Sequence, residues 1–287
     1  MKVVLFCGGL GMRLRDYADN VPKPMVPIGY RPIIWHLMKY YAHFGHKDFV
    51  LCLGYRGDLI KHYFLNYEEC VSNDFVLSDG GKKRELLNSD ISDWRITFIE
   101  TGLNTNIGQR LKAVEPHLAG EEMFLANYSD GLTDLPLPDQ IAHFEAHDAV
   151  ASFLCVKPNL SYHFVTREAD GHVTSFRDIA RSGLRVNGGF FIFRREIFGA
   201  IEEGDELVLE PFQRLLRAQR LLAYDYDGFW LPMDTAKDKK RLDDLHAEGN
   251  PPWQVWHQDA AQPRTDGPRP VPRTTASRPL VYATPER

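Results

Sequence analysis

The sequence lacks the features of a membrane protein, of a nucleic-acid-binding protein and of a metal-cluster protein. It contains no apolar run of about 18 residues, so no transmembrane helix is expected. Its net charge is −5 and it has no basic stripe, which argues against nucleic-acid binding. The cysteines have no metal-ligand spacing, and three of them are expected to be buried thiols in apolar runs: Cys7, Cys52 and Cys155.

The N-terminus has no basic region followed by an apolar core, as a signal peptide would have, because a strand-like run begins at Val3. A cytoplasmic protein is therefore expected. Residues 257–287 contain six prolines and five arginines, and they have little apolar surface to bury. We expect one domain over residues 1–256 and a disordered tail over 257–287, with an interaction arm as the alternative for the tail.

A glycine-rich turn near the N-terminus is the most specific motif. The apolar run Val3–Phe6 predicts a buried strand. Three glycines follow, and without a Cβ they let the backbone approach a ligand closely: Gly8, Gly9 and Gly11. Arg13 and Lys23 then supply two cations. Backbone N–H groups and cations that converge at the end of a strand are typical of a phosphate-binding site.

Three other interpretations of this turn explain less. A P-loop would end in Gly-Lys-Ser/Thr at a fixed spacing that does not occur here. A dinucleotide-binding fingerprint would need a third glycine where Leu14 stands. A turn without a ligand accounts for the glycines but leaves Arg13 and Lys23 unexplained.

Apolar runs alternate with helical patterns along the chain. The strand candidates are residues 3–6, 49–53, 95–99, 123–126, 149–156, 188–193 and 221–226. Apolar residues recur at helical spacing within 33–44, 59–64 and 212–216. This order predicts an α/β fold with a mainly parallel, Rossmann-like sheet flanked by helices. Because ligands bind beyond the carboxyl ends of such strands, the glycine turn and Asp130 could meet in one crevice.

The pattern G-G-x-G-x-R-L, followed by P-K-P-M, is similar to that of the sugar-1-phosphate nucleotidyltransferases. Five further segments resemble successive landmarks of the glucose-1-phosphate cytidylyltransferase branch: Arg31–Gly45, Cys52–Tyr67, Asn127–Leu135, Val186–Phe193 and Gly228–Leu245. The resemblance therefore extends in order over residues 1–256. It implies a nucleotidyltransferase-type fold and an enzyme that forms homo-oligomers.

The resemblance implies an enzyme that joins CTP and α-D-glucose 1-phosphate to give CDP-glucose and pyrophosphate with Mg²⁺. The attacking phosphate is already largely ionised near neutral pH, so the reaction needs aligned anions and neutralised charge rather than a general base. Three alternatives stay open. They are the same chemistry on a different nucleoside triphosphate or a modified sugar 1-phosphate, a non-catalytic nucleotide- or sugar-phosphate-binding regulator, and a glycosyltransferase.

The resemblance also assigns site residues. Arg13 and Lys23 would be the catalytic cations that contact phosphate, and Asp130 and Asp234 would hold Mg²⁺. The nucleotide-binding residues would be Gly8, Gly9, Gly11, Met12, Arg13, Lys23, Gly54, Tyr55, Gly108 and Ser129. The substrate-binding residues would be Asp178, Asn187 and Glu210.

Several of these residues have a plain structural interpretation as well. Asp234 could cap the helix expected after Thr235, and Asn187 could form a strand-entry turn with the two glycines that follow it. Lys23 lies between two prolines and could belong to a stiffened loop. Asp134 is expected to be a surface turn residue.

The sequence departs from the family mainly on the acceptor side. Ile179 stands where the family has a lysine that contacts the sugar phosphate, and Phe164 stands at an acceptor-loop glycine. The cations nearest in sequence are Arg177, Arg181 and Arg185. The nucleotide side carries three milder replacements: Met12, Ser129 and Gln109. This asymmetry suggests that nucleotide activation is retained while the acceptor is a modified or larger sugar phosphate.

Overall fold

A computed structural model describes residues 1–9, 21–158, 162–179 and 182–258 of the chain. The predictions for Gly11, Met12 and Arg13, and the expected tail beyond Gln258, lie outside these residues. Arg181, one of the cations near the acceptor side, lies outside them too.

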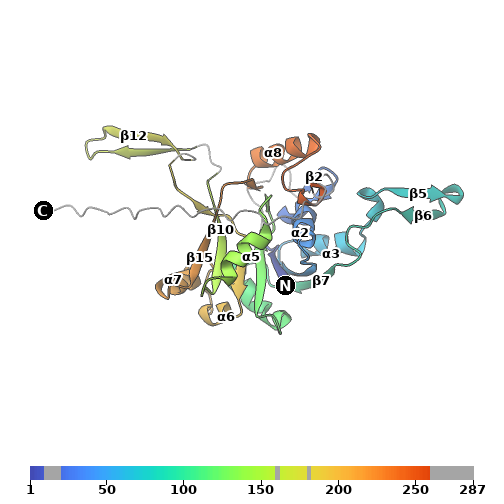
Figure 1. Ribbon diagram of the computed structural model, residues 1–287, viewed down its shortest axis with the longest axis horizontal. Coiled ribbons are helices and arrows are strands. Elements are labelled where there is room, and N and C mark those ends of the chain that lie inside the picture. The colour runs from blue at the N-terminus through green and yellow to red at the C-terminus, as the bar shows by residue number, and fades with distance from the viewer. Residues whose placement is uncertain (10–20, 159–161, 180–181, 259–287) are drawn as a thin grey trace.

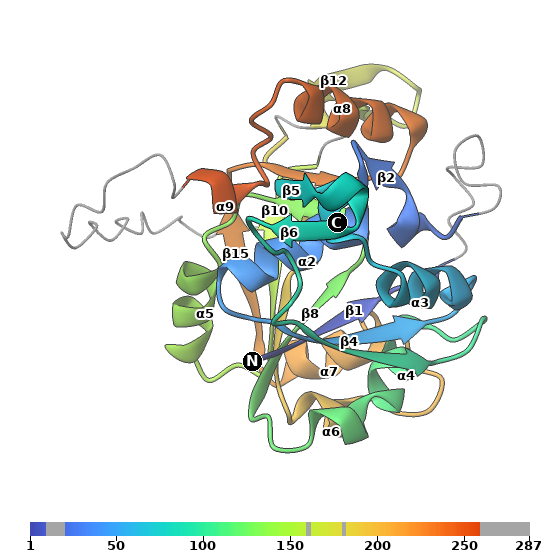
Figure 2. The same ribbon diagram turned by 90° about the vertical axis from the view of Figure 1, so that its right-hand side faces the viewer.

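One eight-stranded sheet forms the centre of the molecule (Figures 1 and 2). From edge to edge its strands are β15 (Leu221–Tyr226), β10 (Ala151–Val156), β14 (Phe191–Arg194), β8 (Met123–Tyr128), β1 (Lys2–Phe6), β4 (Asp48–Leu53) and β7 (Arg95–Glu100). The short strand β13 (Val186–Asn187) also pairs with β10. Six strands run in one direction: β15, β10, β8, β1, β4 and β7. β13 and β14 run antiparallel to these six strands. The predicted mainly parallel α/β sheet is confirmed.

Helices cover both faces of this sheet, because successive residues of a strand point to opposite faces. In β1, Val3 and Leu5 contribute to one buried core, whereas Val4 and Phe6 contribute to the other. The first core includes residues of α2 (Ile33–His43), α3 (Gly57–Leu65), α5 (Leu137–Glu145) and α8 (Ala236–Ala247). The second includes residues of α4 (Ile107–Ala113), α6 (Ile197–Ala200) and α7 (Glu210–Arg217). The three helices expected from apolar spacing are confirmed as α2, α3 and α7.

Short elements near the carboxyl ends of β1 and β8 join distant parts of the sequence. β9 (Gly131–Thr133) pairs antiparallel with β16 (Trp230–Pro232), and β2 (Pro27–Ile28) pairs antiparallel with β3 (Arg31–Pro32). The 3₁₀ turn η2 (Lys23–Met25) directly precedes β2. The remaining helical elements are η3 (Glu69–Val71), η4 (Asp79–Gly81), η5 (Glu115–Leu118) and α9 (Val255–Gln258).

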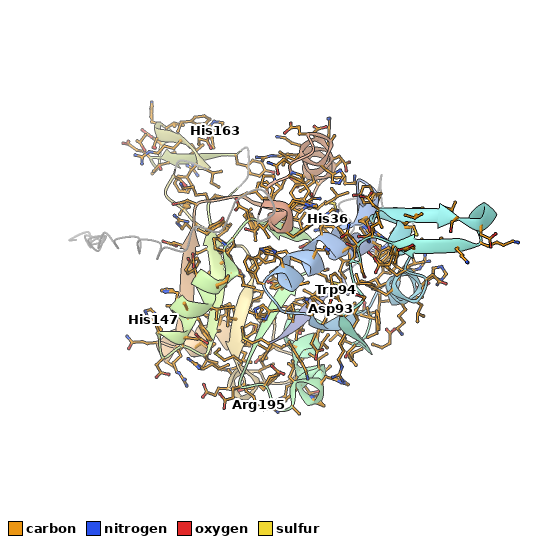
Figure 3. The ribbon with its side chains drawn as sticks, turned by 45° about the vertical axis from the view of Figure 1, so that its right-hand side comes forward. His36, Asp93, Trp94, His147, His163 and Arg195 are labelled. Carbon is orange, nitrogen blue, oxygen red and sulfur yellow. The ribbon has the colours of Figure 1, made fainter. Side chains whose placement is uncertain are left out.

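Two hairpins project from the body of the molecule (Figure 1). One consists of β5 (Phe75–Ser78) and β6 (Lys83–Leu86), and the other of β11 (His163–Arg167) and β12 (Val173–Asp178). Figure 3 shows His163 on the second hairpin, away from the centre of the body. The sequence analysis did not predict these hairpins, because their strands are largely exposed and have no regular apolar face to bury.

Three details differ from the sequence-based expectations. The strand expected over 188–193 begins only at Phe191, because Gly189 and Phe190 adopt positive φ angles of 77° and 49° and form a turn. Cys155 is only partly buried, whereas Cys7 and Cys52 are fully buried as expected. Burial raises the pKa of Cys7 to about 12, so this thiol stays protonated. Within the described ranges, no helix is long and apolar enough to cross a membrane.

Candidate functional site

Three predicted site residues converge at the carboxyl end of β8. The ammonium nitrogen of Lys23 lies 2.5 Å from Oδ2 of Asp130 and 2.7 Å from Oδ1 of Asp234. The Lys23 side chain is 15% exposed, against 25% for Asp130 and 44% for Asp234. The structure therefore brings together one predicted phosphate-binding cation and both predicted metal ligands, in a group that solvent can reach.

Local structure explains how these side chains meet. Pro22 precedes Lys23 in extended conformation, and the N–H of Met25 donates to the Pro22 carbonyl at 2.8 Å, so the lysine lies in a tight turn. Asp130 lies two residues beyond the end of β8, and its carbonyl accepts a hydrogen bond from the N–H of Met233 at 2.8 Å. This bond extends the β9–β16 pairing and places Asp234 beside Asp130.

The positive charge of Lys23 and the negative charges of Asp130 and Asp234 stabilise each other. Burial works to lower the pKa of Lys23, but the carboxylates of Asp130 and Asp234 outweigh it, so the pKa is raised. The two carboxylates thus already accommodate a cation. Among the described residues no cluster of three or more His, Cys, Asp or Glu side chains could hold a metal ion. Two carboxylates with solvent access fit Mg²⁺, which keeps several waters and takes substrate phosphate oxygens as further ligands.

Two structural interpretations from the sequence are wrong. The helix cap is Thr235, whose side chain accepts from the N–H of Asp238 in a capping box, so Asp234 is not the cap. Asp134 is half-buried rather than a surface turn residue. Its carboxylate accepts hydrogen bonds from the Tyr226 hydroxyl and, at 2.8 Å, from the N–H of Phe229. Asp134 therefore holds the chain that leads into β16.

The glycine turn packs against a buried side chain. A Cβ on Gly8 would lie 2.2 Å from Cζ of Arg110, and a Cβ on Gly54 would lie 2.9 Å from the Cα of Gly8. Gly8 and Gly54 therefore bring the carboxyl ends of β1 and β4 together around Arg110. Gly9 is exposed, and no atom of the described residues lies within 4 Å of its would-be Cβ, so its backbone is open to a ligand on the side of the described residues.

Arg110 is a residue of this region that the sequence analysis missed. Arg110 is 3% exposed. Among the described residues, every hydrogen-bond acceptor of its guanidinium is an uncharged oxygen: the carbonyls of Gly8 (3.3 Å), Leu53 (3.1 Å) and Leu103 (3.3 Å) and the Thr101 hydroxyl (2.7 Å). Burial lowers its pKa, yet an arginine stays charged. In the sequence, the signal that could have revealed this residue is an arginine next to an apolar residue within a helical segment. A positive charge thus lies directly beneath the glycine turn.

The other predicted nucleotide-binding residues have clear positions. A Cβ on Gly108 would lie 2.3 Å from the carbonyl oxygen of Asp205, so this glycine lets α4 pack closely on the neighbouring loop. The Ser129 hydroxyl is buried and donates to the Phe6 carbonyl at 2.8 Å, which ties β8 to β1. Tyr55 follows Gly54 and is half-buried just before α3.

The predicted substrate-binding residues are not grouped with Lys23. Asn187 Oδ1 accepts from the N–H of Gly189 at 2.9 Å, which is the turn its sequence suggested. Asp178 ends β12 on the projecting hairpin and is exposed. Glu210 begins α7, where its carboxylate accepts from the N–H of Glu206 at 3.0 Å.

The arginines near the missing acceptor lysine differ in their contacts. Arg185 donates to the carbonyls of Cys155 (3.0 Å) and Tyr226 (3.2 Å) and pairs with Asp227 at 2.9 Å, so its charge is already compensated. Arg177 pairs across the hairpin with Phe164, and both line a pocket of about 390 Å³ on that hairpin.

Comparison with known proteins agrees with this site. The nucleotidyl transferase family matches residues 2–238. The glucose-1-phosphate cytidylyltransferase of Salmonella typhi is 36% identical over 258 residues, which cover 89% of this chain and 100% of that protein. The probable glucose-1-phosphate cytidylyltransferase of Bacillus subtilis (strain 168) is 33% identical, with the same two shares covered.

The fold is also found among solved structures. A putative glucose-1-phosphate thymidylyltransferase from Bacillus anthracis, solved in complex with a sucrose, matches with a TM-score of 0.62 and 15% identity. The match covers 85% of this chain and 94% of that one. From the family match and the full-length relatives, we conclude that the chain belongs to the nucleotidyl transferase family, on the branch that contains glucose-1-phosphate cytidylyltransferases.

Proposed function

We propose that this protein joins CTP and α-D-glucose 1-phosphate to give CDP-glucose and pyrophosphate. The observation that carries the proposal is the convergence of Lys23, Asp130 and Asp234 beside the glycine turn. Relatives that match over their whole length and are 33% and 36% identical support the choice of CTP and glucose 1-phosphate.

The reaction is a displacement at phosphorus. An oxygen of the sugar phosphate bonds to the α-phosphorus of the nucleotide while the bond to pyrophosphate breaks. Asp130 and Asp234 would hold Mg²⁺, which when bound neutralises charge on the phosphates. Lys23 and Arg13 would donate to phosphate oxygens and so hold the two anions in line. The buried charge of Arg110 lies beneath the turn and would favour an anion above it.

A second candidate uses the same chemistry on a different acceptor. The specific observation is the hairpin β11–β12, where Phe164 is 51% exposed and Ile179 takes the place of the family's lysine. Because Arg185 is already paired with Asp227, it does not offer a free charge there. An acceptor with additional apolar or bulky groups would fit these replacements better than plain glucose 1-phosphate.

Pyrophosphate release tests both candidates. We would incubate the protein and Mg²⁺ with each of CTP, dTTP, UTP and GTP and a panel of sugar 1-phosphates that includes glucose. Release with CTP and glucose 1-phosphate supports the first candidate, and release with another acceptor alone supports the second. If no pair releases pyrophosphate although nucleotide binds, the enzyme proposal is wrong and a non-catalytic regulator is favoured.

Two further expectations belong to this proposal. We expect the enzyme in the cytoplasm, where its proposed substrates occur, and we expect a homo-oligomer. The hairpin β5–β6 exposes several apolar side chains that an oligomer could cover: Phe75, Val76, Leu77 and Leu86. Light scattering coupled to size-exclusion chromatography measures the oligomeric state, and a monomer at micromolar concentration would contradict the expectation.

A further inference from the structure

The position of the Lys23 ammonium group has a consequence beyond phosphate binding. It lies within hydrogen-bond distance of both carboxylates that are expected to hold Mg²⁺, at 2.5 Å from Asp130 and 2.7 Å from Asp234. In this structure the lysine thus takes the place of a cation ligated by the two aspartates.

The backbone places the base of the Lys23 side chain within reach of both carboxylates. Lys23 begins a tight turn between Pro22 and Pro24, and Asp130 and Asp234 are joined through the Asp130–Met233 hydrogen bond. Among the described residues, Asp130 and Asp234 are the two carboxylates that pair with this lysine. The chain therefore supplies one counter-ion to two carboxylates that would otherwise repel each other.

An ammonium group and a divalent cation compete for the negative charge of these two carboxylates. Mg²⁺ requires oxygen ligands at about 2.0–2.1 Å in near-ideal octahedral geometry, and a second positive charge within hydrogen-bond distance of the same oxygens would oppose it. The metal is therefore held more tightly once Lys23 has moved away from the two carboxylates. The phosphates of a nucleotide bring the acceptor oxygens to which a displaced ammonium can donate.

We propose that Lys23 is an exchangeable counter-ion, which occupies the cation site of the substrate-free protein and moves to the nucleotide phosphates when the metal enters. The inference rests on the proposed function, since it takes the incoming ligand to be a nucleoside triphosphate. It makes metal binding and nucleotide binding mutually dependent, because each favours the same displaced position of one side chain. The free protein then has low affinity for the metal alone.

The competing explanation is a permanent ion pair. In that case Lys23 holds Asp130 and Asp234 together as a structural link and stays there in every state. Removing the lysine would then disorder the two carboxylates, and affinity for a divalent cation would fall or stay unchanged. The two explanations therefore predict opposite changes in metal affinity.

Mn²⁺ binding to the full chain without nucleotide distinguishes them. Mn²⁺ prefers the same oxygen ligands as Mg²⁺ and can be followed by electron paramagnetic resonance. We would titrate the wild type and the variants Lys23→Met, Lys23→Gln and Lys237→Met. Lys237 is an exposed lysine close to Asp234 in sequence, without a salt bridge among the described residues, so its variant controls for the loss of one positive charge.

We expect Lys23→Met and Lys23→Gln to bind Mn²⁺ at least about tenfold more tightly than the wild type, and Lys237→Met to match the wild type. Adding Asp130→Asn to Lys23→Met should abolish the gain. Unchanged or weaker binding in both Lys23 variants, with circular dichroism spectra like that of the wild type, overturns the proposal. So does an equal gain in Lys237→Met.

The readout is independent of turnover. If Mn²⁺ binds more tightly without Lys23 but no substrate pair releases pyrophosphate, the exchange stands and the proposed function fails. If pyrophosphate is released but Mn²⁺ affinity does not rise, the proposed function stands and the exchange fails. Repeating the titrations with Mg²⁺, measured by calorimetry, shows whether the result is specific to Mn²⁺.

Discussion

The nucleotide side of the proposed site rests on buried strands, whereas the acceptor side rests partly on an exposed hairpin. Gly8, Ser129 and Asp130 follow the fully packed strands β1 and β8, and Ser129 ties these strands together. Asp178 and Phe164 belong to β12 and β11, which project from the body (Figure 1). Substitution of a residue that packs against the buried cores lowers the stability of the fold, whereas substitution of an exposed hairpin residue changes it little.

This difference matches where the sequence departs from its family. The replacements on the acceptor side are the larger ones, Ile179 for a lysine and Phe164 for a glycine. On the nucleotide side, Lys23, Asp130 and Asp234 match the residue types that the resemblance implies, and they contact one another in this structure. The comparison suggests that activation of the nucleotide and choice of the acceptor are separable in this fold. Substitutions on each side, and in the packing beneath them, can break or sharpen this comparison.

The largest effect is expected for the carboxylates. Asp130→Asn and Asp234→Asn should each lower kcat about a thousandfold or more, which corresponds to about 4 kcal/mol, because a carboxylate that holds Mg²⁺ loses its charge. Pyrophosphate release at saturating substrates measures this. The control is Asp139→Asn, an exposed aspartate in the first turn of α5, which should keep wild-type turnover. Near-normal turnover in both site variants would show that the metal assignment is wrong.

The glycine turn should respond according to what surrounds each glycine. Gly8→Ala places a methyl group 2.2 Å from the buried Arg110 guanidinium, so the free energy of unfolding should fall by about 1–3 kcal/mol. Gly9→Ala, with no neighbour within 4 Å in the part of the chain that the structure describes, should change it by less than about 0.5 kcal/mol. Urea denaturation compares the pair. Equal losses in both variants would mean that Arg110 does not pack tightly under Gly8.

Restoring the family's cation tests the acceptor side. Ile179→Lys should raise kcat/KM for glucose 1-phosphate about tenfold, or about 1.4 kcal/mol, while leaving the KM for the nucleotide unchanged. Ile179→Met, of similar length and uncharged, is the matched control. A change in nucleotide KM, or an equal gain in the methionine variant, would break the separation of the two sides.

The smallest effect is expected for the buried His36 and concerns the pH dependence of stability. Burial lowers the pKa of His36 in α2 from 6.5 to about 3, despite its hydrogen bond with the Ile28 carbonyl. The Trp253 N–H donates to the other ring nitrogen of His36 at 3.3 Å, so the folded state holds a neutral ring. The unfolded chain takes up a proton near pH 6.5 and the folded one does not. Stability due to this group is therefore present above pH 6.5 and lost as the pH falls.

For His36 we expect the free energy of unfolding to be about 1 kcal/mol lower at pH 6 than at pH 7.5. His36→Gln, which cannot titrate, should lose the part of the pH dependence that His36 contributes, while keeping an amide that can donate to the Ile28 carbonyl. Urea denaturation at the two pH values measures it. If the variant shows the same pH dependence as the wild type, the proton is taken up elsewhere.

Part of this protein could be predicted from its sequence by local rules. The apolar runs that became β1, β4, β8 and β10 are largely buried on both faces, and those of the edge strands β7 and β15 are partly buried. Such runs are visible in a sequence without any partner. The glycine turn and the residue types Lys23, Asp130 and Asp234 were visible for the same reason, since a phosphate site needs glycines, cations and carboxylates. The exposed hairpins gave no such signal.

The tertiary structure alone decided how these residues meet. Lys23 contacts Asp130 across 107 positions of sequence and Asp234 across 211, and no local pattern reports a contact at that range. It also decided that Thr235 caps α8, that Asp134 is half-buried and that Arg110 lies under Gly8. The sequence determined which groups were available, because their chemistry is local. The fold determined which of them became neighbours, because packing of the sheet against its helices is not.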